Sequence, residues 1–122
     1  MHASKVIFVL GLVLAVAFAG YAGRPRTLEG DDLKEAEQLL STTLSQLATG
    51  DGPSYQLVNL ISATSQVVSG TLRTYKVELS DGSDKKQCTV KIWSQPWLEE
   101  SGKGINIKVQ CEGDEAELDR TW

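Results

Sequence analysis

Two short segments in the C-terminal half alternate apolar and polar residues, and each carries one of the chain's two cysteines. They span residues 87–94, with Cys88, and residues 105–111, with Cys111. Such alternation is typical of half-buried β-strands. If the cysteines face each other in an antiparallel pair, three more pairs share their face: Val90 with Val109, Ile92 with Ile107, and Ser94 with Ile105. The polar residues fall on the other face: Lys91, Asn106, Lys108 and Gln110. Because the cysteine positions and the alternation agree, the sequence predicts this register.

The N-terminus has the three-part pattern of a secretory signal peptide. Residues 1–5 are basic, residues 6–18 are almost wholly apolar, and small residues follow. The apolar run is too short to span a bilayer. Cleavage after Ala19 or after Ala22 fits the small-x-small rule. We expect residues 1–19 to be a signal peptide and residues 20–122 to form one secreted domain. In an oxidising compartment Cys88 and Cys111 should pair, which would add roughly 3 kcal/mol of stability.

Removal of the signal peptide excludes several classes of function. Cleavage after Ala19 leaves 103 residues with 11 basic and 16 acidic side chains, a net charge of −5. The sole histidine, His2, is removed, so a Ser–His–Asp or Cys–His pair cannot form. A disulfide would occupy the last candidate nucleophile. We therefore expect no enzyme, no catalytic residue, no metal site and no cofactor. Without a basic cluster or a second apolar run, we also expect no nucleic-acid or membrane binding.

Spacing of apolar residues predicts one helix followed by strands. Seven residues recur on one helical face over residues 32–48: Leu33, Ala36, Leu39, Leu40, Leu44, Leu47 and Ala48. Asp32 and Glu35 resemble a capping box, and Gly50 is expected to be a left-handed C-cap. Residues 55–68 predict a long bent or bulged strand, and residues 72–79 predict a second strand. The acidic tail over residues 112–119 is expected to be loosely ordered.

Two predicted hairpin tips carry apolar side chains. The first spans residues 66–70 and includes Val67 and Val68, while the second spans residues 95–104 and includes Trp97. Exposed apolar tips favour a partner surface, and tryptophan is enriched at interface hot spots. The simpler readings are an ordinary turn for the first tip and, for Trp97, a ring folded back onto the sheet. Trp93 is predicted to pack in the middle of its strand, and no role is predicted for Trp122.

The tips resemble those of a known family. Gln66-Val67-Val68-Ser69-Gly70 is similar to the Gln-x-Val-x-Gly loop of the cystatins, and Pro96-Trp97 is similar to their second-hairpin Pro-Trp. A glycine-bearing leader, a single helix, a long strand into the first loop, and a cysteine eight residues before Pro-Trp occur in the family's order. The resemblance covers the mature chain except the acidic tail. It is to secreted, type-2-like cystatins of the insect type, with a single disulfide.

The resemblance implies an α+β, cystatin-like fold, with one α-helix wrapped by a four- to five-stranded antiparallel sheet. It also implies reversible, tight-binding inhibition of papain-like, cathepsin-type cysteine proteases by a monomer. The two tips would enter the primed side of the cleft, and an N-terminal trunk would fill the unprimed subsites. The implied protease-binding residues are Gly23, Gln66, Val67, Val68, Ser69, Gly70, Pro96 and Trp97. The alternative is a secreted cystatin-fold protein that binds or defends without inhibiting.

Some features of the family pattern are missing or ambiguous here. The chain can form one disulfide, whereas secreted animal cystatins often have two. Gly23 and Gly30 are both candidates for the trunk glycine, and Gly23 is preferred because its distance from Gln66 is closer to the family's usual separation. That choice requires cleavage after Ala19. No loop similar to Ser-Asn-Asp is visible, so legumain inhibition is not expected. The sequence leaves open the target protease, the biological role and strand-swapped dimerisation.

Overall fold

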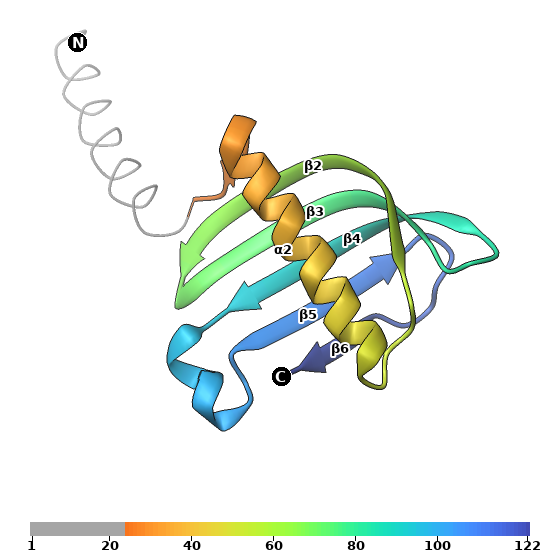
Figure 1. Cartoon of the computed structure of the whole chain (residues 1–122). Helices are drawn as coiled ribbons and strands as arrows, with labels where there is room; N and C mark the ends of the chain where they lie inside the picture. Colours follow the sequence, from red (N-terminus) through yellow and green to blue (C-terminus); the bar gives the residue numbers. More distant parts are fainter. Residues whose placement is uncertain (1–23) are drawn as a thin grey trace, which may run out of the picture.

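The computed structural model describes residues 24–122 as one helix packed on one antiparallel sheet (Figure 1). The proposed signal peptide and Gly23 lie outside the described residues. In chain order, the elements are β1 (Arg26–Thr27), α2 (Gly30–Thr49), β2 (Gln56–Val68), β3 (Gly70–Ser80), β4 (Lys85–Ser94), the 3₁₀-helix η1 (Pro96–Ser101), β5 (Ile105–Cys111) and β6 (Leu118–Thr121). The strands lie in the order β1-β2-β3-β4-β5-β6. This is the α+β architecture expected, but with six strands rather than four or five, because short strands extend both edges of the sheet.

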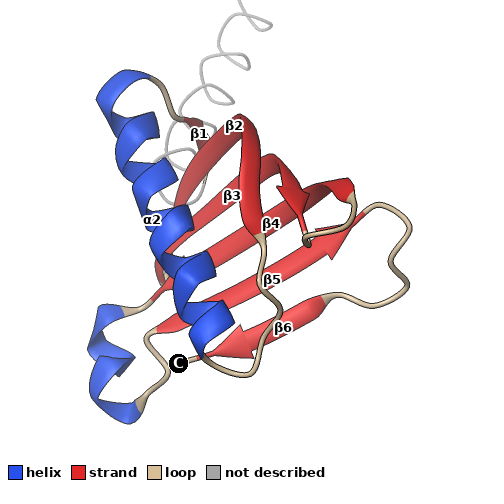
Figure 2. Cartoon of the chain, turned by 45° about the vertical axis from the view of Figure 1, so that its right-hand side comes forward, coloured by secondary structure: helices blue, strands red, loops and turns tan. Residues whose placement is uncertain are grey.

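Helix α2 forms because its apolar face is buried against the concave face of the sheet (Figure 2). Its buried residues are Ala36, Leu40, Thr43, Leu44 and Leu47. The predictions for the two ends of α2 are wrong. The N-cap is Glu29, which makes no side-chain cap, and Asp32 instead accepts a hydrogen bond from Arg26 at 3.2 Å. Gly50 has φ −85°, so it is not left-handed, although its N–H reaches the carbonyl of Gln46.

Strand β3 supplies the centre of the core, where Tyr75, Val77 and Leu79 all face the helix and are buried. The Tyr75 hydroxyl donates to the carbonyl oxygen of Ala36 at 2.8 Å, which connects the middle of the sheet to α2. Burial raises the pKa of Tyr75 to about 12, because it disfavours the phenolate. The ring is therefore both a packing element and a polar link between the two layers.

Strand β2 is long and bulged, as its sequence predicted. Its pairing with β3 shifts register between Leu57 and Asn59 and again between Leu60 and Ser62. Val58 and Ile61 are the extra residues, and both are exposed. Each bulge bends the strand and increases its twist. These bends let the 13-residue strand curve around the helix while its far end continues to the first tip.

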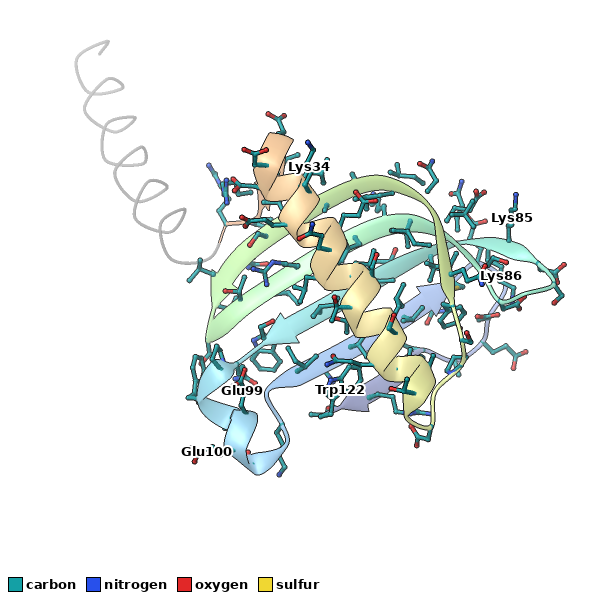
Figure 3. The ribbon with its side chains drawn as sticks, in the orientation of Figure 1. Lys34, Lys85, Lys86, Glu99, Glu100 and Trp122 are labelled. Atoms are coloured by element: carbon teal, nitrogen blue, oxygen red, sulfur yellow. A yellow bond between two sulfur atoms is a disulfide. The ribbon has the colours of Figure 1, made fainter. Side chains whose placement is uncertain are left out.

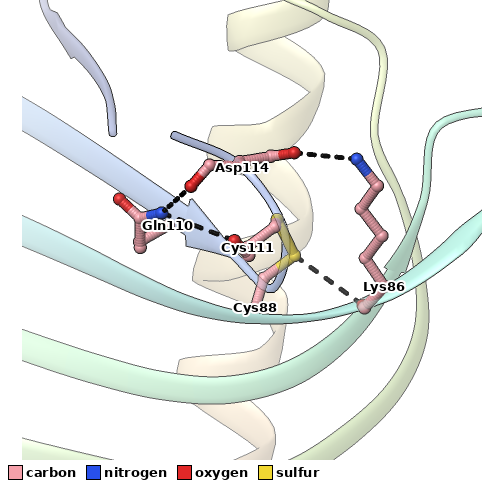
Figure 4. The surroundings of a disulfide bond; sticks show 5 residues. All are labelled: Lys86, Cys88, Gln110, Cys111 and Asp114. Atoms are coloured by element: carbon pink, nitrogen blue, oxygen red, sulfur yellow. Dashed lines mark hydrogen bonds and ion pairs between the residues drawn. A yellow bond between two sulfur atoms is a disulfide. The ribbon is translucent and has the colours of Figure 1, made fainter. Parts of the chain in front are cut away.

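The register of β4 and β5 is the one that the cysteines and the alternation predicted. Cys88 pairs with Cys111, Val90 with Val109, and Ile92 with Ile107. The disulfide joins Cys88 and Cys111 directly across the two strands. In Figure 4 the turn after Cys111 is fixed by Asp114, whose carboxylate accepts from Lys86 at 2.8 Å and whose carbonyl accepts from Gln110 at 3.0 Å.

The expectation of a loosely ordered tail is wrong for its last residues. Leu118–Thr121 form β6 along the edge of β5, and Trp122 continues the pairing through two backbone hydrogen bonds with Ile105. The indole of Trp122 lies beneath the end of α2 (Figure 3) and donates to Gln46 at 3.1 Å. β6 pairs with the edge of β5 that β4 does not cover, and Leu118 and Trp122 pack against the core, which composition alone does not indicate.

Candidate functional site

The first tip joins β2 to β3 through a very tight turn. Val68 pairs with Gly70, so Ser69 alone lies between the two strands, and the residues expected in a loop are mostly strand. Gly70 has φ +95°, a conformation that favours glycine. A Cβ built on Gly70 would also collide with the backbone carbonyl oxygen of Ser94. Glycine is therefore required at this position by both conformation and space.

Apolar side chains at the first tip face solvent. Val67 is 64% exposed and Val68 is 38% exposed. Val67 pairs with Thr71 in a part of the hairpin that extends beyond the helix-covered core. Burying such side chains against a partner would be favourable, since the free energy falls when apolar surface is removed from water. The tip therefore has the character of a contact surface.

The second tip is a short 3₁₀-helix between β4 and β5. It is closed at its base by a hydrogen bond from the Gln95 N–H to the Gly104 carbonyl at 2.8 Å. Pro96 begins η1, where its fixed φ suits the first helical position. Trp97 follows and is 60% exposed, so its ring is not folded back onto the sheet. Glu99 and Glu100 extend from the same short helix (Figure 3), which gives this tip an acidic side.

Both tips lie at the same end of the sheet. The ends of β2 and β3 and the η1 helix gather there in Figure 1, and the pairing of Thr71 with Ser94 brings the bases of the tips together. Two contacts join them further: Gly70 lies against Ser94, and the Trp93 indole donates to the Ser69 carbonyl at 2.8 Å. Val67, Val68 and Trp97 are thus presented on adjacent tips.

The N-terminal strand enters beside the first tip. Arg26 pairs with Ser65 and Thr27 with Thr64, in antiparallel orientation. Of the described residues, 24 and 25 therefore precede β1 on the side of the first tip, and Leu28 follows β1 and is buried in the core. Gly30 lies on the helix side of β1, away from the tip, as the first residue of α2. Gly23, the preferred trunk glycine, lies outside the described residues, so the choice between Gly23 and Gly30 stays a prediction.

Charged groups with shifted pKa values lie at the opposite end of the sheet. Hydrogen bonds from the backbone N–H groups of Asp84 and Ser83 lower the pKa of Asp81 to about 2. A hydrogen bond and the negative charge of Asp114 raise the pKa of Lys86, and Figure 3 places Lys85 and Lys86 at this far end. Among residues 24–122, no cluster of three or more His, Cys, Asp or Glu is arranged to bind a metal ion. The groups whose pKa values are shifted therefore lie away from the exposed Val67, Val68 and Trp97 of the tips.

Sequence reasoning located both tips but missed one residue that connects them. Trp93 was interpreted as packing alone, whereas its indole N–H contacts the first tip. Alternation placed Trp93 on the largely polar face of β4, beside Leu72 of β3 in the structure. The sequence did contain a signal for this contact: Trp93 is a large side chain with an N–H donor on a polar face, four residues before Trp97.

The fold is that of a small α+β domain with two exposed hairpin tips at one end of its sheet. A family model for the cystatin domain matches residues 23–110, and the chain belongs to the cystatin family. It is similar to a Cystatin-like protein of Drosophila melanogaster, with 57% identity over the full length of both chains. It is also similar to Sarcocystatin-A of Sarcophaga peregrina, with 44% identity over 90% of this chain and 92% of that protein. Cysteine proteinase inhibitor 3 of Oryza sativa subsp. japonica is 29% identical over 53% of this chain and 35% of that protein.

Across residues 24–122, no helix combines the length and apolar character needed to cross a membrane.

Proposed function

We propose that this chain is a reversible, tight-binding inhibitor of papain-like, cathepsin-type cysteine proteases. Family membership and the similarity to Cysteine proteinase inhibitor 3 of Oryza sativa support this class of function. The observation that carries the proposal is the exposure of Val67, Val68 and Trp97 on two tips that lie side by side. A surface of this kind suits insertion into an open cleft.

Inhibition would occur by occlusion. Gln66–Gly70 and Pro96-Trp97 would lie on either side of the protease's catalytic cysteine without presenting a peptide bond to it. The N-terminal segment, with Gly23 as its glycine, would extend from β1 into the unprimed subsites. The tips are built on paired strands, so little conformational freedom is lost on docking. This preorganisation favours tight binding.

The inhibitor would carry no nucleophile of its own in this reaction. Both cysteines of the chain are joined in the disulfide. We further propose that residues 1–19 are removed on secretion and that residues 20–122 act outside the cell as a monomer. Cleavage after Ala19 would retain Gly23 and the start of the trunk.

Titration of papain with protein beginning at Gly20 tests the proposal. The N-terminus should first be verified by mass spectrometry, because trimming would remove the trunk. We expect activity to fall in proportion to added protein, to return on dilution with time, and the inhibitor to be recovered uncleaved. No inhibition at micromolar protein with the correct N-terminus would instead indicate the non-inhibitory alternative.

A further inference from the structure

Trp93 connects the base of the second tip to the end of the first. It lies in β4, three residues before the 3₁₀-helix, where it pairs with Leu72 of β3 and Asn106 of β5. Its indole Nε1–H donates to the Ser69 carbonyl at 2.8 Å. Ser69 is the residue between the paired Val68 and Gly70, so it lies outside the strand ladder. The bond therefore joins the turn of one hairpin to the adjoining hairpin.

A second contact brings the same two segments together. Gly70 approaches the backbone of Ser94 so closely that a side chain there would meet the Ser94 carbonyl, with Gln95 Cγ also nearby. Ser94 follows Trp93, and Gln95 begins the second tip. The indole bond holds Ser69 against Trp93, and the close contact places Gly70 against Ser94. Both Trp93 and Ser94 lie at the end of β4. Beyond these contacts the first tip is exposed, as Val67 and Val68 show.

We propose that Trp93 is a positioning residue: its indole N–H holds the first tip in a fixed place relative to Trp97, so that both enter a protease cleft as one rigid body. This inference rests on the proposed function and extends it to a residue outside the loop motifs. Trp93 acts through Ser69 and Gly70 rather than through its own contact with the protease. Its effect is on the fraction of inhibitor molecules whose two tips are correctly arranged before binding.

The size of the effect follows from the strength of a single hydrogen bond. A hydrogen bond contributes about 0.5–1.5 kcal/mol net, which corresponds to roughly a two- to tenfold bias toward the bonded arrangement. Loss of the bond shifts the equilibrium between arranged and displaced tips by this factor, so the competent fraction and the apparent affinity fall by up to the same factor. The tip residues that touch the protease are unchanged, so the loss should fall on the association rate. A lost contact would instead raise the dissociation rate.

Trp93→Phe isolates the N–H, since the aromatic ring remains between Leu72 and Asn106. Trp122→Phe is the matched control: it also removes one indole hydrogen bond, from Trp122 to Gln46, but that bond joins the residue after β6 to α2 and does not involve the first tip. Both variants should first be shown by thermal melting to be folded. Their association and dissociation rates with papain are then measured by progress curves, beside the wild type.

We expect Trp93→Phe to lower the association rate by a factor of up to about ten with the dissociation rate unchanged, and Trp122→Phe to change neither. An unchanged association rate in Trp93→Phe overturns the inference, whether or not the dissociation rate rises. A rise in dissociation alone would show that Trp93 contacts the protease itself.

A second readout separates this inference from the proposed function. ¹⁵N relaxation of the free proteins reports order parameters for the Ser69 and Gly70 amides without any protease. We expect both values to fall in Trp93→Phe and to stay unchanged in Trp122→Phe. If the wild type fails to inhibit papain, the proposed function is wrong, and these order parameters decide the positioning role alone. Unchanged values in Trp93→Phe overturn it.

Discussion

Trp97→Ala should weaken inhibition of papain strongly while leaving the fold intact. Trp97 is 60% exposed in the free protein. A tryptophan side chain can bury up to about 250 Å², so roughly 150 Å² remains for a protease to cover. At about 25 cal/mol per Å², that area is worth at most about 4 kcal/mol. This is the upper limit for the contribution of the ring to binding.

The measured loss should be smaller than this limit, because alanine keeps part of the contact and docking itself costs side-chain freedom. We expect about 1–3 kcal/mol, the range typical of an interface anchor, which raises the inhibition constant about 5- to 150-fold. The free energy of unfolding should change by less than about 0.5 kcal/mol, since a mostly exposed side chain contributes little to the core.

Steady-state inhibition of papain, with thermal melting in parallel, measures both quantities. Ile61→Ala is the matched control: Ile61 is 53% exposed, yet it lies on a bulge in the middle of β2, away from both tips. Its inhibition constant should equal that of the wild type. If Trp97→Ala inhibits as well as the wild type, the exposed ring is not an anchor, and the reasoning from exposure to contact fails.

Three further changes test other parts of the molecule. Replacing both cysteines, Cys88→Ser with Cys111→Ser, removes a cross-link over 23 residues. The free energy of unfolding should fall by roughly 3 kcal/mol and the melting temperature by about 10 °C or more. A decrease in melting temperature of less than about 3 °C would contradict this. Tyr75→Phe should cost about 1 kcal/mol by chemical denaturation, because it loses the bond to Ala36. Burial raises the pKa of Tyr75 from 10.0 to about 12, so the unfolded state loses this proton first and wild-type stability should fall as pH rises across that interval. Tyr75→Phe should show a shallower fall, and equal slopes for the two proteins would argue against the assignment. Deleting residues 20–23 should weaken papain binding with little change in melting temperature, and a large thermal loss would instead place this segment within the fold.

Local patterns were sufficient for much of the fold. The leucines of α2 repeat at helical spacing, and most of them are buried as that spacing indicates. Alternation across β4 and β5, combined with two cysteines, allowed one register, and the structure has that register throughout. These features are predictable because each depends on neighbours in sequence or on a single covalent link.

Three local signals predicted an arrangement that the tertiary structure does not adopt. Gly50 follows a helix and suggests a left-handed cap, yet the chain turns there with negative φ as it leaves for β2. Asp32 could have capped the helix, but Arg26 of β1 lies close enough to bind it. The acidic tail lacks a strand pattern, although Leu118 and Trp122 find apolar neighbours on the sheet and under the helix. Only the tail is decided by partners remote in sequence, whereas Arg26 lies six residues from Asp32 and the Gly50 N–H bonds to Gln46.

The sequence alone established the helix, the bulged strand, the β4–β5 register and the two tips with their apolar residues. Periodicity and short motifs act over a few residues, and the cysteine pair adds one covalent link, so these features can be predicted without knowledge of the rest of the chain. The exposure of Trp97, the adjacency of the tips and the bond from Trp93 to Ser69 became visible only in three dimensions. They depend on how the curved sheet brings the ends of separate hairpins together, and no single segment encodes that arrangement.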